Sequence, residues 1–109
     1  MQLSSDMQNG TLVVTVDEPR IDAAIAIQFK DRMRSATEQG KARVVLNLAK
    51  VDFIDSSGLG AIVAAMKQLG QQRRLDLSCL NPNVDKVFRL TRMDTVFRIH
   101  DTLGDALAD

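Results

Sequence analysis

The chain has 109 residues, of which 45% are hydrophobic, and its fourteen acidic and fourteen basic side chains leave no formal net charge. A chain of this size and composition can build a hydrophobic core without disulfides or a structural metal, so we expect one domain over residues 1–109. The balanced charge argues against a global attraction to nucleic acid or to an anionic membrane surface. No apolar run reaches the roughly 20 residues that span a bilayer, and the first residues lack a signal-peptide pattern, which predicts a cytoplasmic protein without membrane insertion.

The first part of the chain predicts a β-hairpin followed by a helix. The β-branched segment Thr11–Val16 comes directly after the turn dipeptide Asn9-Gly10, so it should pair with a strand within residues 2–8. Asp22 is placed to cap a helix, and Gly40 is placed to end it. The apolar positions of this helix recur every three or four residues and are Ile25, Phe29, Met33 and Ala36.

The middle of the chain predicts a buried strand and a second helix. The nearly continuous apolar run Val44–Leu48 is typical of a central strand that is covered on both faces. A helix should follow from about residue 57 to 69, and Gly70 should end it. The apolar stripe of this helix consists of Leu59, Ile62, Val63, Met66 and Leu69.

The last third of the chain predicts another strand, helix and strand. Residues 75–79 alternate between apolar and polar side chains, as a strand does. Pro82 then suits the first turn of a third helix, and residues 96–99 form a weak last strand. Cys79, the only cysteine, should act as a small buried apolar residue.

A short C-terminal helix is predicted around Leu103 and Leu107, with Asp105 and Asp109 facing away from the core. The complete order is ββαβαβαβα. This order predicts an α/β fold with a mixed sheet of four to five strands and right-handed crossover helices. In such sheets the loops that leave the carboxyl ends of the strands gather at one edge and carry function.

The hexapeptide Asp55-Ser56-Ser57-Gly58-Leu59-Gly60 is one of these loops, and it places two hydroxyls where a helix begins. Free backbone N–H groups and the positive end of the helix dipole would stabilise a phosphate on Ser57. Gly58 and Gly60 would leave the serine open to the backbone of another protein or to a nucleotide. The same spacing also fits a purely structural role, in which Ser56 or Ser57 caps the helix and the glycines form a tight turn.

Enzymatic and nucleotide-binding motifs match this loop poorly. Asp55 stands where the nucleophile elbow of α/β-hydrolases has its first glycine, and His100 is the only histidine, so we expect no catalytic residues and no enzyme. Val63 stands where a dinucleotide-binding motif has its third glycine, and no Lys-Ser or Lys-Thr pair follows the loop.

Two other classes of site are also weakly supported. One histidine and one cysteine do not make a convincing set of metal ligands, so no metal or other cofactor is expected. Lys86, Arg89 and Arg92 follow one another at helical spacing, but without interleaved aromatic residues they fit a solvated helix face better than a nucleic-acid interface.

The segment Val51–Gly60, which follows an apolar strand, resembles the signature of STAS-domain proteins. In particular it is similar to the single-domain anti-anti-sigma factors, or anti-sigma factor antagonists, of bacterial partner-switching systems. The resemblance extends from about residue 11 to residue 107, with weaker matches at Ile21-Asp22 and Val87–Thr91. It implies a STAS-like fold for most of the chain.

The resemblance also implies a function and a site. In the family, the unphosphorylated protein binds an anti-sigma factor that is also a serine kinase of the histidine-kinase-like ATPase fold. Phosphorylation ends that binding, and a PP2C-type serine phosphatase restores it. By this resemblance Ser57 is the phosphorylated residue and Asp22 lies near it. The expected partner-binding edge consists of Asp22, Asp55, Ser56, Ser57, Gly58 and Leu59.

The chain departs from the family at Pro19-Arg20, where many members have a glycine before the residues that correspond to Ile21-Asp22. The geometry and charge of that loop, and with them partner specificity, are therefore expected to be its own. The alternative function is a STAS domain that does not switch and serves as a subunit of a lipid-transport or stressosome-type assembly. The intact Asp55–Gly58 motif favours the switch, because a scaffold needs no exposed acceptor serine.

Overall fold

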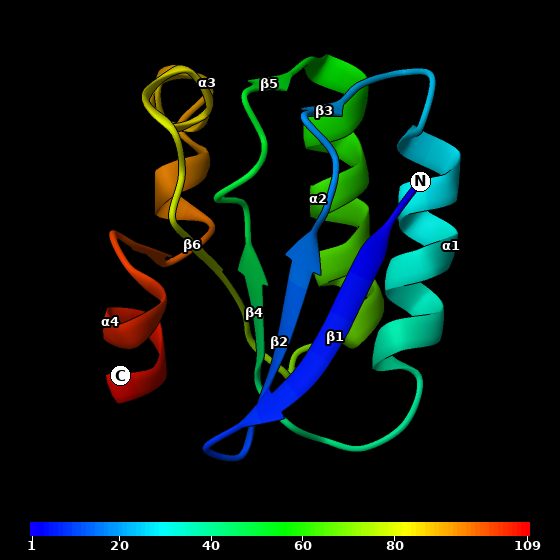
Figure 1. Ribbon diagram of the computed structural model, residues 1–109, viewed down its shortest axis with the longest axis vertical. Helices are drawn as coiled ribbons and strands as arrows, with labels where there is room; N and C mark the ends of the chain where they lie inside the picture. Colours follow the sequence, from blue (N-terminus) through cyan, green and yellow to red (C-terminus); the bar gives the residue numbers. More distant parts are fainter.

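The computed structural model describes residues 1–109, in which a five-stranded mixed sheet carries helices on both faces (Figure 1). The strand order is β1-β2-β4-β6-β7, with β1 Leu3–Gln8, β2 Thr11–Val16, β4 Val44–Asn47, β6 Leu75–Ser78 and β7 Ile99–His100. The pair β1 and β2 is antiparallel, and every other neighbouring pair is parallel. The predicted mixed α/β sheet is therefore confirmed, and β4 is its central strand, as the apolar run predicted.

The hairpin forms at the predicted turn. Asn9 and Gly10 both have positive φ angles, 52° and 75°, which is the conformation of a type I′ turn. This turn matches the twist of the two strands and fixes their register, so that Gln8 lies opposite Thr11 and Leu3 lies opposite Val16.

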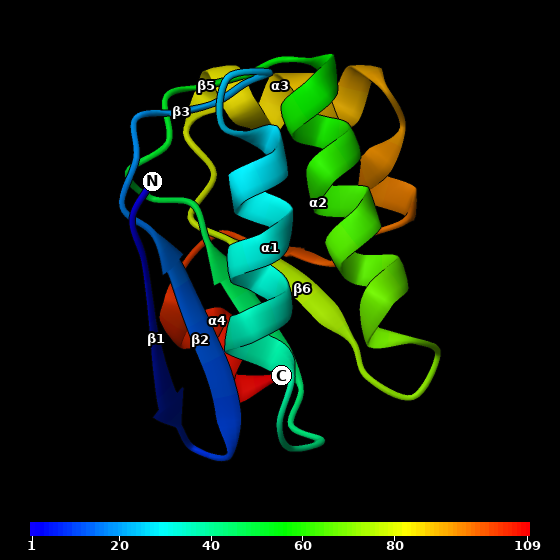
Figure 2. The ribbon, with the colours of Figure 1, turned by 90° about the vertical axis from the view of Figure 1, so that its right-hand side faces the viewer.

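Two helices pack next to each other on one face of the sheet, α1 (Ala26–Thr37) and α2 (Ser56–Leu69) (Figure 2). Between them and the sheet lies the main hydrophobic core, to which Phe29, Leu46, Ile62 and Leu77 each contribute a fully buried side chain. The remaining helices are α3 (Pro82–Leu90), the short 3-10 helix η1 (Met93–Thr95) and α4 (Leu103–Ala108). No helix combines the length and hydropathy that crossing a bilayer requires.

The buried line of α2 differs from the predicted stripe. Ile62 is fully buried, but the other four residues of the stripe, Leu59, Val63, Met66 and Leu69, are only half-buried. The other buried positions of the helix are Gly58, Ala61 and Ala65. These residues are small and let α2 lie close to its neighbours, most closely at Gly58, where an added Cβ would overlap the backbone of Ile21. Gly70 ends α2 as predicted, with a φ of 81°.

Helix α1 begins later than the sequence predicted. Its N-cap is Ile25, which makes no side-chain cap, so Asp22 does not cap the helix. Residues 22–25 instead form a turn in which the Asp22 carboxylate accepts a hydrogen bond from the backbone N–H of Ala24 at 3.1 Å. An Asp side chain that bonds the backbone two residues ahead is a typical turn former, and this local bond competes with helix initiation.

Two short strands were not predicted. Strand β3 (Arg20–Ile21) and strand β5 (Phe53–Ile54) pair in parallel outside the main sheet. At two residues each, they are too short for alternation to reveal them. Their pairing brings the Pro19-Arg20 loop to the turn that precedes α2.

The last strand is shorter than predicted and is shifted toward the C-terminus, because of residues 96–99 only Ile99 pairs with β6, followed by His100. Val96 follows directly after η1, and Phe97 is buried against Phe88, with ring centroids 6.0 Å apart in an edge-on arrangement. An aromatic side chain that fills the core here replaces continued strand pairing.

Strand β6 forms where the alternation predicted a strand, and all four of its residues are buried. Leu75 and Leu77 face the main core, while Asp76 and Ser78 point to the opposite face of the sheet, where α4 contacts β6 and β7. The alternation was real, but a helix that follows much later in the chain covers its polar side.

Candidate functional site

The two serines of the hexapeptide lie at the start of α2, at the end of the molecule where β3 and β5 pair (Figure 1). Ser56 and Ser57 are the first two residues of the helix, and both are exposed. The chain reaches them in an extended conformation at Asp55, with φ −105° and ψ −176°. The serines therefore stand at the open N-terminus of a fourteen-residue helix.

Asp55 is the N-cap of α2, and neither serine has that role. One of its carboxylate oxygens accepts a hydrogen bond from the Gly58 N–H at 2.8 Å, and the other accepts one from the Ala23 N–H at 3.1 Å. These backbone bonds, that from Gly58 foremost, lower the pKa of the Asp55 carboxyl. Neither Ser56 nor Ser57 therefore caps the helix, which was the structural role that the sequence had left open for them.

Gly58 serves packing, which corrects the prediction that both glycines keep the serine accessible. The residue is buried, and a Cβ atom on it would lie 2.0 Å from the carbonyl oxygen of Ile21. Only glycine lets the first turn of α2 approach β3 so closely. At Gly60, by contrast, a Cβ would meet no atom within 4 Å.

Asp22 lies on the same edge, in the loop that Asp55 holds through the Ala23 N–H. Its carboxylate also forms an ion pair with the Arg20 guanidinium at 3.2 Å. Leu59 is half-buried and packs against the core, so only part of its side chain is available at the surface. The structure thus brings the predicted site residues together, with Asp55 as the link between the two loops.

Sequence reasoning missed two further features of this edge. The Arg20 guanidinium lies over the ring of Phe53, 4.4 Å from its centroid, so β3 and β5 are joined by a cation–π contact as well as by their backbones. Phe53 and Ile27 are among the large hydrophobic residues that remain exposed, by 42% and 70% of their surface. The amphipathic pattern of the first helix could have indicated Ile27, because it falls on the polar side.

The two hydrogen bonds that the Asp55 carboxylate accepts lead to a prediction for stability. Asp55→Ala should lower Tm by roughly 5 °C, because it leaves the N–H groups of both Gly58 and Ala23 without their acceptor. Thermal unfolding followed by circular dichroism measures the change. Asp31→Ala, which removes an exposed carboxylate from α1, is the matched control and should leave Tm within about 2 °C of the wild type. Equal Tm values for both variants would contradict the role assigned to Asp55.

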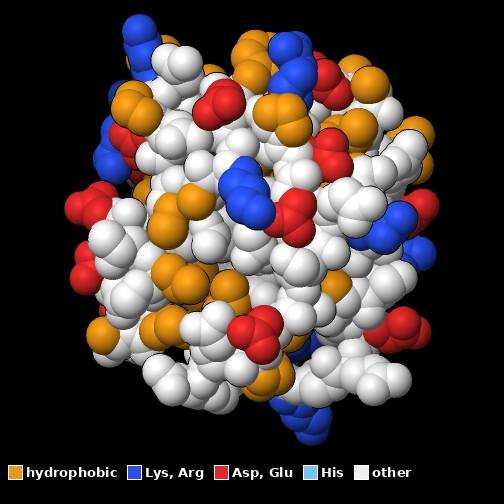
Figure 3. Space-filling model, viewed as in Figure 1, with side chains coloured by type: hydrophobic (Ala, Val, Ile, Leu, Met, Phe, Trp, Pro, Cys, Tyr) orange, Lys and Arg blue, Asp and Glu red, His pale blue; other side chains and the backbone are white.

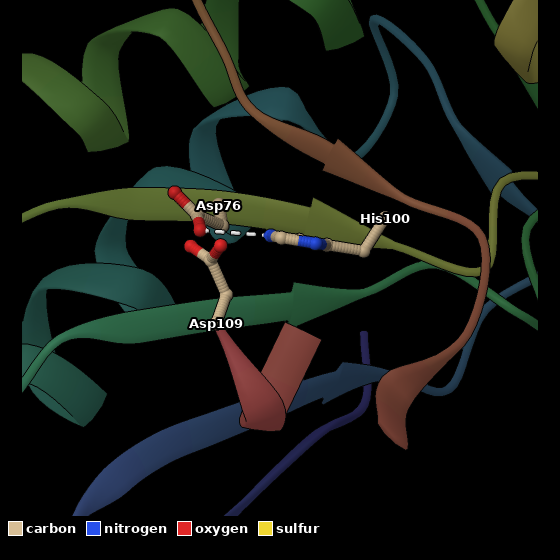
Figure 4. Close-up of side chains that lie close together, drawn as sticks. All are labelled: Asp76, His100 and Asp109. Atoms are coloured by element: carbon tan, nitrogen blue, oxygen red, sulfur yellow. Dashed lines mark hydrogen bonds and ion pairs between the residues drawn. The ribbon is translucent and has the colours of Figure 1, made fainter. Parts of the chain in front are cut away.

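A second cluster of ionisable groups lies on the face of the sheet that α4 covers. Asp76, His100 and Asp109 offer ligand atoms that all lie within 4.8 Å of one another (Figure 4). However, the carboxylates of Asp76 and Asp109 already form ion pairs with arginine side chains. Arg43 and Arg74 contact Asp76 at 2.6 and 2.7 Å, and Arg74 also contacts Asp109 at 2.6 Å. This is the geometry of an ion-pair network, in which bound guanidinium groups take the place that a cation would need.

Asp109 is exposed and faces away from the core, as predicted, and its carboxylate is bound by Arg74 at 2.6 Å and by Arg98 at 2.9 Å. His100 is the last residue of β7, and its Nε2 lies 3.0 Å from the Asp76 carboxylate. The only histidine is therefore engaged away from the serines, which leaves them without a neighbouring imidazole base.

A cavity near the end of α2 also lies away from the serines. It has a volume of about 600 Å³ and is lined by residues from the end of α2, from β6 and from the segment before β7. Two of its cationic residues, Arg74 and Arg98, are bound to Asp109. On the face shown in Figure 3, charges of both signs are interspersed. Arg89 of the predicted basic stripe is itself paired with Asp85 at 2.9 Å.

The sheet order, with the exposed serines at the start of α2, is the architecture of a STAS domain, and the profile of the STAS domain family matches residues 2–106. The chain belongs to the STAS domain family. BtrV of Bordetella bronchiseptica, provisionally named an anti-sigma factor antagonist, is 31% identical to this chain over 99% of it and 93% of BtrV. The anti-sigma-B factor antagonist of Listeria monocytogenes is 33% identical over 78% of this chain and 75% of that protein.

Solved structures share the fold. An anti-sigma-factor antagonist (STAS) domain protein from Planctomyces limnophilus superposes with a TM-score of 0.88 over 97% of this chain and 95% of that chain. The two sequences are 21% identical, so this likeness bears on the fold alone.

Proposed function

We propose that this protein is an anti-sigma factor antagonist that works as a phosphorylation-controlled partner switch. The unphosphorylated protein binds a cognate anti-sigma factor, which is also a serine kinase of the histidine-kinase-like ATPase fold. Phosphorylation of Ser57 ends the binding, and a PP2C-type phosphatase reverses it. The relatives named as anti-sigma factor antagonists support the class of function.

The observation that carries the proposal is the exposed Ser57 at the second position of α2, where Asp55 rather than a serine provides the cap. A hydroxyl that is exposed and not needed as a cap can be modified without loss of a structural contact. The positive end of the helix dipole stabilises an anion at this position. The modification should therefore change the surface and leave the fold intact.

Charge explains why phosphorylation would end binding. A phosphoserine carries about −1.5 to −2 charges at neutral pH. On Ser57 this charge would be added to an edge that already presents the carboxylates of Asp22 and Asp55. A partner whose surface fits the unmodified edge would then face repulsion and the cost of desolvating the phosphate.

Phosphorylation itself is tested by intact mass. After incubation with ATP and the kinase of this ATPase fold encoded nearest to the protein's gene, the wild type should gain one phosphate and Ser57→Ala should gain none. Ser56→Ala should still gain it, which separates the two neighbouring hydroxyls. A wild type without mass gain would contradict the switch and favour the non-switching STAS subunit. A gain that is lost only in Ser56→Ala would move the acceptor to Ser56.

The same variants test binding. In a titration followed by calorimetry, Ser57→Ala should bind the kinase with the Kd of the wild type, because the loss of one hydroxyl does not change the charge of the edge. Ser57→Asp should bind about tenfold more weakly or worse, because its carboxylate imitates part of the phosphate charge.

A further inference from the structure

Gly60 is a glycine that the fold itself does not require. It lies in the second turn of α2, is exposed, and has no positive φ angle. A Cβ atom added to it would meet no other atom within 4 Å. Gly58, two residues earlier, is the opposite case. The fold requires a glycine there, because a Cβ atom would overlap the backbone of Ile21.

A glycine inside a helix weakens it, because the unfolded chain loses more backbone freedom there than with any other residue. Alanine at position 60 would remove this disadvantage and would fit the space. Within the protein nothing compensates for the glycine. A contact outside the protein would account for it.

The position of Gly60 indicates which contact. It follows Ser57 by three residues, and residues at that spacing are neighbours on a helix surface. Both residues are exposed. Ile27, whose side chain is 70% exposed, lies in the first turn of α1, at the same end of the molecule (Figure 2). This end of the molecule thus presents a stretch of helix backbone without a side chain beside Ser57, and an exposed apolar side chain on the neighbouring helix.

We infer that Gly60 is a contact residue for the anti-sigma factor, and that its missing side chain lets the partner's chain lie directly on the backbone of α2 beside Ser57. This inference rests on the proposed function and deepens it. The occupant is the kinase itself, since the partner must bring its active site to the Ser57 hydroxyl. Any side chain at position 60 holds the two backbones apart.

The test is a size series at position 60. Gly60→Ala should raise Tm by about 2–5 °C and weaken binding of the kinase at least tenfold, and Gly60→Leu should weaken it further. The rate of Ser57 phosphorylation should fall in the same order. Gly104→Ala is the matched control, because Gly104 is an exposed helical glycine of α4 whose added Cβ would meet only the Thr102 Oγ1, at 3.8 Å. This control should bind like the wild type.

The outcomes separate the inference from the proposed function. If the wild type binds the kinase and Gly60→Ala binds it with the same Kd, the inference is wrong and the proposed function stands. If Gly60→Ala lowers Tm, the fold needs the glycine and the inference is wrong as well. If the wild type neither binds the kinase nor gains phosphate, both fall. A higher Tm together with weaker binding of the kinase in Gly60→Ala, and unchanged binding in Gly104→Ala, supports the inference.

Discussion

Replacing Gly58 by alanine is expected to lower the free energy of unfolding by about 3 kcal/mol, a large effect for one methyl group. The added Cβ would lie 2.0 Å from the carbonyl oxygen of Ile21 and 2.7 Å from its carbonyl carbon. Backbone atoms do not move aside as the end of a flexible side chain does, so α2 and β3 must separate. Chemical denaturation at constant pH measures the loss.

The separation of α2 from β3 should also disturb the candidate site. The Asp55 N–H donates a hydrogen bond to the same Ile21 carbonyl at 3.3 Å. The clash therefore affects the contact between β3 and the residue that precedes α2, which positions the start of the helix. Gly60→Ala is the matched comparison, since it adds the same methyl group two residues later in the same helix. If both alanine variants were equally stable, the close packing assigned to Gly58 would be wrong.

Asp76→Ala is expected to cost about 3–5 kcal/mol of stability, because it removes the central anion of a buried ion-pair network. The Asp76 side chain is 1% exposed, and Arg43, which it contacts at 2.6 Å, is 18% exposed. Without the carboxylate, the Arg43 guanidinium is left in a largely buried position without its closest partner. Asp31→Ala, which removes an exposed carboxylate, should change stability by less than about 0.5 kcal/mol in the same denaturation experiment.

The Asp76 carboxylate should also make the free energy of unfolding depend on pH. Burial by itself raises the pKa of Asp76, but hydrogen bonds from Arg74, Arg43 and His100 outweigh it and hold the pKa well below its usual range. A pKa that is depressed in the folded state gives stability that is fully present above about pH 5 and is lost as the pH falls toward the folded-state value. Asp76→Asn should therefore show a shallower loss of stability between about pH 5 and pH 2 than the wild type. Identical pH profiles would contradict this role.

Local patterns determined most elements of the fold. The Asn9-Gly10 dipeptide predicted the hairpin because two adjacent positive φ angles suit few other residues. The apolar run of β4 predicted a strand covered on both faces, and Gly70 predicted the end of α2. Each of these signals acts within a few residues, where chain geometry alone decides.

Contacts between distant segments account for the errors. Asp76 is a polar residue of an alternating strand, yet it is buried, because α4 contacts β6 and because Arg43 and Arg74, which precede β4 and β6, bind its carboxylate. The start of α1 was misplaced because Asp22 bonds its own turn. Strands β3 and β5 escaped notice because each exists only as the partner of the other.

At the candidate site, the sequence by itself determined the hexapeptide, its place before a helix and its family resemblance. Only the tertiary structure decided the role of each residue in it. Asp55 caps α2 through the Gly58 N–H, and it also accepts a hydrogen bond from the N–H of Ala23, 32 residues earlier. Gly58 and Gly60 look alike in the sequence, yet one lies against the Ile21 carbonyl and the other faces open space. Glycine carries no side chain whose polarity reveals its surroundings, so only the packing of β3 against α2 tells the two apart.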